Sequence, residues 1–142
     1  MGLSQRNKGA RFERSVVNTF KDAFADRDGV ARAGMAQGFG GQAFPDVFVP
    51  GHPSLWVECK VGGPARYPVK ALAQATGDLG RRDRAKFVPV AVTKIDRYAP
   101  KATLGLPDLF LLAGVPDACP RDCSATVTLD FDAFVAFVGS RI

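Results

Sequence analysis

The segment FPDVFV, residues 44–49, is followed after a short gap by LWVECK, residues 55–60. Both segments are rich in β-branched and aromatic residues and are bounded by glycine and proline, which predicts two short strands. Side chains in a strand alternate between the two faces of the sheet. The second strand is therefore expected to present Glu58 and Lys60 side by side on one face, with Val57 on the other.

Asp46 lies in the first of these predicted strands. If the two strands pair as a hairpin, Asp46 joins Glu58 and Lys60 at one edge of the sheet. Two carboxylates provide hard oxygen ligands of the kind that Mg²⁺ and Mn²⁺ prefer, and an ammonium group provides a compact positive charge. This combination suits a divalent cation that acts on a phosphodiester.

The chain has 142 residues, of which 46% are hydrophobic and 23% are charged. These values predict one folded domain, residues 1–142, with a core of its own. No apolar run is long enough for a transmembrane helix, so no membrane partner is expected. The basic N-terminal residues lack the apolar stretch of a signal peptide, and the three cysteines fit a reducing compartment, which predicts a cytoplasmic location.

Positive charge is concentrated in the first part of the chain. Residues 1–101 contribute +8 to the net charge of +5, and residues 102–142 contribute −3. Such a basic region predicts a surface that attracts a polyanion, although many small proteins are basic without a specific reason. The chain has only two glutamates, Glu13 and Glu58, against twelve aspartates.

Residues 7 to about 27 predict an amphipathic helix, with Asn7 as its N-cap and its end between residues 26 and 29. Glu13 lies on the same stripe as the apolar residues of this helix. A carboxylate at the edge of a buried stripe needs a partner. Two interpretations remain open: Glu13 pairs with Arg11 or Arg14, or it faces the cluster at Asp46 and Glu58.

The rest of the chain predicts an α/β fold with a mixed central β-sheet flanked by helices. Further strands are expected at residues 30–33, 87–92, 109–112 and 126–129, and helices at residues 68–82 and after Asp130. Pro89 places the strand at 87–92 on a sheet edge or at a bulge. The glycine-rich residues 34–41 predict a loop whose backbone can approach a nucleic acid closely.

Pro45-Asp46, eleven residues and Glu58-Cys59-Lys60 together form the pattern PD-(x)n-ExK. With it, the chain resembles the PD-(D/E)xK nuclease superfamily, and within it the archaeal-type Holliday junction resolvases and their phage-like relatives. The resemblance extends from about residue 8 to residue 97. It includes the basic opening helix that carries Glu13, Arg32 before a glycine-rich loop, and a glutamine-bearing helix after the ExK strand.

The resemblance implies a restriction-endonuclease-like fold and a Mg²⁺-dependent endonuclease that acts on DNA, with Mn²⁺ able to substitute. Asp46, Glu58 and the main-chain carbonyl of Cys59 would hold the metal. Lys60 would hold the attacking water or stabilise the developing charge. Glu13 would complete the outer coordination or orient water.

Nucleic-acid contacts are expected from Arg11, Arg32, Lys70 and Gln74. For each of them, an ordinary solvent-exposed position is the alternative. A resolvase that cuts branched DNA in recombination would act as a homodimer, because two symmetric incisions need two active sites in matching orientation. Residues 126–138 are the candidate for part of the dimer surface, with core as their alternative.

Two other functions fit the same residues. One is a non-catalytic DNA-binding module that kept the nuclease fold, and the other is a nuclease that acts on other DNA or on RNA.

His52, the one histidine, lies between Gly51 and Pro53. This position favours a turn residue over a general base.

Overall fold

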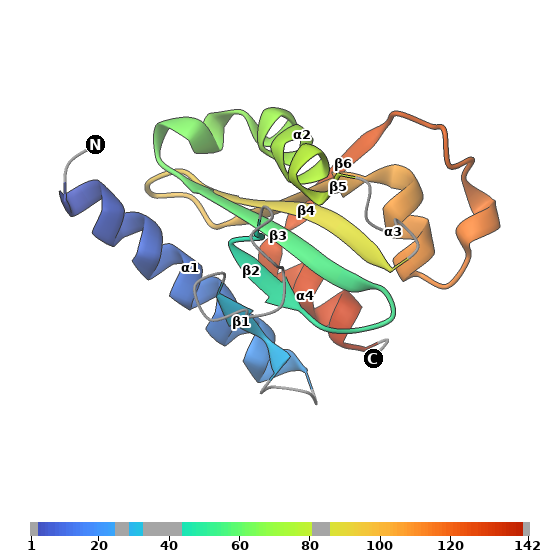
Figure 1. Ribbon diagram of the computed structural model, residues 1–142, viewed down its shortest axis with the longest axis horizontal. Helices are drawn as coiled ribbons and strands as arrows, with labels where there is room; N and C mark the ends of the chain where they lie inside the picture. Colours follow the sequence, from blue (N-terminus) through green and yellow to red (C-terminus); the bar gives the residue numbers. More distant parts are fainter. Residues whose placement is uncertain (1–2, 25–28, 33–43, 81–85, 141–142) are drawn as a thin grey trace.

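A computed structural model describes residues 3–24, 29–32, 44–80 and 86–140 of the chain. Six strands form one mixed sheet in the order β1-β2-β3-β4-β5-β6. Helices cover both faces of this sheet (Figure 1). The predicted α/β class, with a mixed central sheet flanked by helices, is confirmed.

The strands are short, apart from β3 and β4 at the centre of the sheet. Their bounds are β1 Ala31–Arg32, β2 Val47–Val49, β3 Ser54–Val61, β4 Phe87–Lys94, β5 Lys101–Gly105 and β6 Thr126–Asp130. The α-helices are α1 Leu3–Ala23, α2 Pro68–Leu79, α3 Leu106–Leu112 and α4 Phe131–Gly139. Among the described residues, the 3₁₀ turns η3 Gly63–Arg66 and η4 Pro116–Ala118 are also present.

The hairpin predicted from residues 44–60 forms between β2 and β3, with Val47 opposite Val57. The chain then crosses over through η3 and α2, so β4 runs parallel to β3. β5 and β6 follow as antiparallel neighbours. Because β3 and β4 are parallel, their C-terminal ends meet at the same edge of the sheet.

The sheet separates two apolar layers. Leu55 and Val57 of β3 belong to the main core, together with residues of α1 and α4 such as Phe20 and Phe134. On the opposite face, Trp56 is fully buried against α2 residues. The alternation predicted for β3 is therefore confirmed, and Glu58 and Lys60 lie on the α2 face with Trp56.

The apolar face of α4 proved to be core. Phe131, Phe134, Val135 and Val138 of α4 are all buried. Their i, i+3, i+4, i+7 spacing matches one helix face that packs against the sheet. These four residues are therefore core, while residues 126–130 form the edge strand β6 and stay a predicted part of the dimer surface.

One predicted strand is wrong. Residues 109–112 lie in α3, and the strand of this region is β5, which the sequence analysis missed. Four consecutive apolar residues fit either a strand or a buried helix. Pro107 and Asp108 in the first turn of α3 favour the helix, because proline suits a helix start and an acidic group suits the N-terminal end of the helix dipole.

The helix boundaries also differ from the expectation. α1 begins at Leu3, so Asn7 lies inside the helix and does not cap it. The surrounding glutamine, arginine and lysine residues are good helix formers, which lets the helix extend past its apolar stripe. α1 ends at Ala23, and the predicted end at residues 26–29 falls mostly outside the described residues, as does the glycine-rich loop at 34–41. α2 ends at Leu79, three residues before the predicted end at residue 82, because Gly80 follows with a φ of 63°.

Pro89 lies in a central strand, which contradicts the predicted edge or bulge. β5 pairs with β4 only at residues Ala91 to Thr93, so Pro89 lies beyond that ladder. A residue without an N–H is tolerated where the neighbouring strand does not pair.

Within the described residues, no helix has both the length and the apolar character needed to cross a membrane.

Candidate active site

Asp46 lies directly before the first residue of β2, and its side chain links the start of this strand to β3. One step beyond the pair Val47–Val57, the antiparallel register places Asp46 opposite Glu58. The backbone N–H of Cys59 donates a hydrogen bond of 2.8 Å to Oδ2 of Asp46. The aspartate is thereby held beside the two residues that flank Cys59 in the sequence.

Glu58 and Lys60 form an ion pair at the C-terminal part of β3. Nζ of Lys60 lies 3.1 Å from Oε1 of Glu58, and the Glu58 side chain is only 5% exposed. The carboxyl groups of Glu58 and Asp46 lie close enough for each to shift the pKa of the other. The hairpin therefore brings both carboxylates and the ammonium group together, as the sequence predicted.

Burial and crowding change the acidity of both carboxyl groups. Burial and the charge of Asp46 together raise the pKa of Glu58 to about 7, against the opposing effect of Lys60. Burial also raises the pKa of Asp46, against the hydrogen bond from Cys59 and the charge of Lys60. Because two buried carboxylates repel each other, the pair tends to keep a proton near neutral pH unless a cation replaces it.

The donor set fits a hard divalent cation. Asp46 and Glu58 offer carboxylate oxygens, and the carbonyl of Cys59 lies on the main chain between Glu58 and Lys60. Across the part of the chain that the structure describes, no group of three or more His, Cys, Asp or Glu side chains could hold a metal. Mg²⁺ is commonly held by one or two carboxylates, with water and substrate phosphate completing its octahedron, so this small set is sufficient.

Glu13 pairs with an arginine, but not with one from its own helix. Nε and Nη2 of Arg32, on β1, donate hydrogen bonds of 3.1 and 3.0 Å to Oε2 of Glu13. Burial raises the pKa of Glu13, Arg32 opposes the shift, and the charge of Asp46 adds to it. Glu13 therefore lies within electrostatic range of Asp46, while its direct partner is Arg32.

The thiol of Cys59 is on the opposite face of β3 from Glu58, packed against the main core. Burial raises its pKa well above the ordinary thiol value, and the charges of Asp46 and Glu13 act in the same direction. A neutral thiol is a poor nucleophile. The Cys59 side chain is thus a packing group, and only its main-chain atoms belong to the site.

Two of the four expected nucleic-acid contacts lie next to the ion pair. Lys70 and Gln74 of α2 line a pocket of about 350 Å³ together with Lys60 and Tyr67. Arg32 forms an ion pair with Glu13, and Arg11 is exposed on α1 away from this pocket.

His52 lies before the first residue of β3, at the end of the strand opposite to Lys60. This position agrees with the predicted turn residue.

Two residues near the site were missed by the sequence analysis. The charge of Asp78 raises the pKa of both Asp46 and Glu58. The spacing of residues 70, 74 and 78 along one helix face would have indicated it. Tyr67 is exposed at the start of α2 and lines the pocket at Lys60, and no pattern in the neighbouring sequence indicated this position.

Comparison with models of known protein families gives no match, and comparison with curated protein sequences gives none either. A solved structure that the chain resembles is that of Hjc from Archaeoglobus fulgidus, a Holliday junction resolvase from an archaeal hyperthermophile. The sequence identity is 16%, the TM-score is 0.43, and the match covers 92% of this chain and 99% of that chain. Similarity at this level carries no argument about chemistry, which rests here on the geometry of the site.

Proposed function

We propose that this chain is a metal-dependent endonuclease of the PD-(D/E)xK superfamily, with a restriction-endonuclease-like fold, that hydrolyses phosphodiester bonds in DNA. One observation carries the proposal. Asp46 and the Glu58-Cys59-Lys60 segment come from adjacent strands and converge through two contacts, Cys59 N to Asp46 at 2.8 Å and Lys60 to Glu58 at 3.1 Å.

In this proposal, Asp46, Glu58 and the Cys59 carbonyl hold Mg²⁺, for which Mn²⁺ substitutes. The ion neutralises charge on the phosphate and lowers the pKa of a bound water. Lys60, whose side chain is 27% exposed, is positioned by Glu58 and donates hydrogen bonds to the attacking water or to the developing negative charge. Its partial exposure gives substrate access to the ammonium group.

The surface around Lys60 suits a phosphate backbone. Lys70 and Gln74 line the same pocket as Lys60 and can contact phosphates on either side of the cleaved bond. Arg11 adds positive charge on α1, away from this pocket. Arg32 contributes through its bonds to Glu13, and its register partner on β2 is Val47, next to Asp46.

A substrate panel tests the activity. The DNA substrates are a four-way junction, a flap, a nicked duplex, a linear duplex and a single strand, and RNA is tested beside them. We expect cleavage of DNA with Mg²⁺ or Mn²⁺ and no cleavage with EDTA. Asp46→Asn and Glu58→Gln should each abolish cleavage and leave binding intact or stronger, because each removes a negative charge from the surface that meets a polyanion.

Asp117→Asn provides the matched control, since Asp117 is exposed on η4 and loses the same charge. This variant should cleave as wild type does. Full metal-dependent cleavage by Asp46→Asn or Glu58→Gln would remove the proposed site. Tight DNA binding without cleavage under any of these conditions would instead leave a non-catalytic binding module.

Branched DNA is the proposed preferred substrate, and a two-fold homodimer is the proposed active form, because two symmetric incisions need two sites in matching orientation. Sedimentation with and without a four-way junction tests the second statement. A monomer in both conditions would overturn the dimeric resolvase and leave the nuclease.

A further inference from the structure

A second pocket, of about 340 Å³, lies on the same face of the sheet as Glu58 and Lys60. It is next to the candidate site, because Lys60 of β3 is the register partner of Thr93 on β4 and Thr93 lines the pocket. The turn η3 lies between the two pockets. Gly63 and Pro64 of this turn line the pocket at Lys60, and Ala65 and Arg66 line the second pocket.

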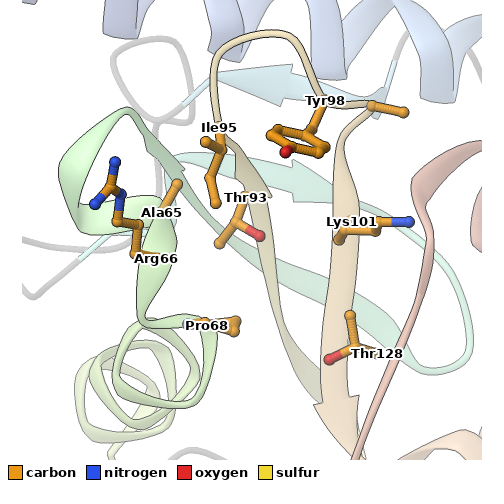
Figure 2. Close-up of a pocket in the computed structure, with 9 residues that line it drawn as sticks. Ala65, Arg66, Pro68, Thr93, Ile95, Tyr98, Lys101 and Thr128 are labelled. Atoms are coloured by element: carbon orange, nitrogen blue, oxygen red, sulfur yellow. The ribbon is translucent and has the colours of Figure 1, made fainter.

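The floor of the second pocket is a part of the sheet that α2 does not cover. α2 packs against Trp56 of β3 and Ala91 of β4, whereas Thr128 of β6 is exposed. Thr93 and Thr128 contribute side chains to this floor from β4 and β6 (Figure 2). The hydroxyl group of Thr128 is hydrogen bonded to that of Thr103 at 2.8 Å.

The walls of the pocket are apolar and include one exposed aromatic ring. Pro68 stands on the α2 side, and Ile95 and Tyr98 stand on the β4–β5 turn opposite, as Figure 2 shows. Tyr98 is 68% exposed, so its ring is accessible to a ligand in the pocket. The amine of Lys94 donates a 3.3 Å hydrogen bond to the carbonyl of Tyr98, which ties the turn to the end of β4.

The surroundings of the pocket are positively charged. Arg66 lines it, and Lys94 and Arg97 belong to the same turn region as Tyr98. The one acidic group of this turn, Asp96, is paired with Lys8 at 2.8 Å. A ligand that complements flat apolar walls, hydroxyl groups and a positive rim has a planar ring and a phosphate.

We propose that this pocket receives an unpaired nucleobase of the bound nucleic acid, from a nucleotide near the phosphodiester at Lys60, with Tyr98 stacking on the base. The proposal rests on the proposed function for the location of that phosphodiester. A paired base within a duplex is stacked on its neighbours and cannot offer its face to Tyr98. The pocket therefore selects nucleic acid with unpaired nucleotides beside the cleaved bond, such as a branched or tailed duplex.

Equilibrium binding in EDTA tests the pocket without relying on cleavage. The probes are a fluorescein-labelled DNA duplex with a single-stranded oligothymidine tail and a fully paired duplex of the same length, both followed by anisotropy. Tyr98→Ala should weaken binding of the tailed duplex about tenfold, the size of one lost base–aromatic stack, and leave the paired duplex unchanged. Tyr98→Phe should bind as wild type does, because it keeps the ring.

Val115→Ala is the control variant, since Val115 is an exposed apolar residue before η4 and lines neither pocket. It should leave both affinities unchanged. Thermal melting of each variant shows whether the fold is kept.

A tail of abasic residues distinguishes stacking from a general effect of the substitution. Wild type should bind the abasic tail about tenfold more weakly than the oligothymidine tail, and Tyr98→Ala should bind the two tails equally. Equal binding of both tails by wild type would overturn the pocket, and metal-dependent cleavage would still support the nuclease. The expected binding pattern without any cleavage would support the pocket and overturn the nuclease.

Discussion

The backbone N–H of Cys59 donates a 2.8 Å hydrogen bond to Oδ2 of Asp46 and so connects the two halves of the proposed site. Glu58 and Lys60 flank Cys59 in the sequence, and their side chains leave the strand on the same face. A side-chain acceptor that binds the N–H between them is therefore held beside both. The geometry of the cluster depends on this bond and not only on the pairing of β2 with β3.

Substitutions of Asp46 should separate the contribution of this hydrogen bond to stability from the effect of the carboxylate charge. Asp46→Ala leaves the Cys59 N–H without its acceptor, whereas Asp46→Asn keeps an oxygen there and removes the repulsion with Glu58. We expect Asp46→Ala to be about 2 kcal/mol less stable than Asp46→Asn, and Asp46→Asn to be at least as stable as wild type without metal. Urea unfolding measures the difference, with Asp117→Ala as the control, and equal stability of the two Asp46 variants would contradict it.

The stability of the metal-free protein should fall as the pH rises. Burial and Asp46 raise the pKa of Glu58 from 4.5 to about 7 in the folded protein. A carboxyl group with a raised pKa favours folding fully below its unfolded pKa, and this contribution is lost as the pH approaches and passes the folded value. The urea midpoint should therefore decrease between these two pH values, and Glu58→Gln should flatten the decrease.

Addition of Mg²⁺ should offset this loss. The ion binds the ionised carboxylates of the folded protein, so it stabilises the fold most at and above neutral pH. A urea midpoint that stays constant over the same pH range without metal would mean that Glu58 is solvated more fully than its burial indicates.

Lys60→Ala should separate metal binding from catalysis. Lys60 lowers the pKa of Glu58 through its hydrogen bond and its charge. Its loss therefore makes the site harder to ionise, and metal binding should weaken at neutral pH and recover in more alkaline solution. Cleavage should stay lost at both pH values, because the ammonium group itself is missing. Calorimetry with Mg²⁺ and a cleavage assay measure the two effects, and recovery of cleavage together with metal binding would contradict the assigned role.

The parts of the structure that the sequence predicted are those governed by local rules. The alternation of side chains along residues 55–60 and the short connection to residues 44–49 were enough to bring Asp46, Glu58 and Lys60 together. Residues 109–112 were assigned wrongly because a short apolar run does not distinguish a strand from a buried helix. β5 was missed because its five residues, KATLG, show no clear period.

Long-range contacts of the site could not be read from local patterns. Glu13 was expected either to face the cluster or to pair with Arg11 or Arg14, whereas its partner is Arg32, which is distant in the sequence and comes from β1. The pocket at Tyr98 needs the β4–β5 turn, η3 and β6 to meet. No single segment of the sequence carries that arrangement.

The pair formed by Glu13 and Arg32 leads to the last prediction. Both guanidinium contacts, from Nε and Nη2, go to the same oxygen of Glu13. Glu13→Gln weakens this charge-assisted pair and releases Arg32, and Arg32→Gln removes the same interaction from the other side. We therefore expect each substitution to lower cleavage about tenfold, and the double substitution to be no worse than either one, because both break one interaction.

The change in melting temperature on addition of Mg²⁺ decides whether Glu13 acts through Arg32 or on the cation. If Glu13 acts only through Arg32, the Glu13→Gln variant keeps the rise in melting temperature that Mg²⁺ gives wild type, and this is the expected result because Asp46 and Glu58 remain in place. If Glu13 lies in the outer coordination of the ion, as the sequence resemblance implies, the rise becomes smaller in Glu13→Gln and stays unchanged in Arg32→Gln. Additive losses of cleavage together with a smaller rise would assign Glu13 to the metal, and non-additive losses with an unchanged rise would assign it to the positioning of Arg32 beside Asp46.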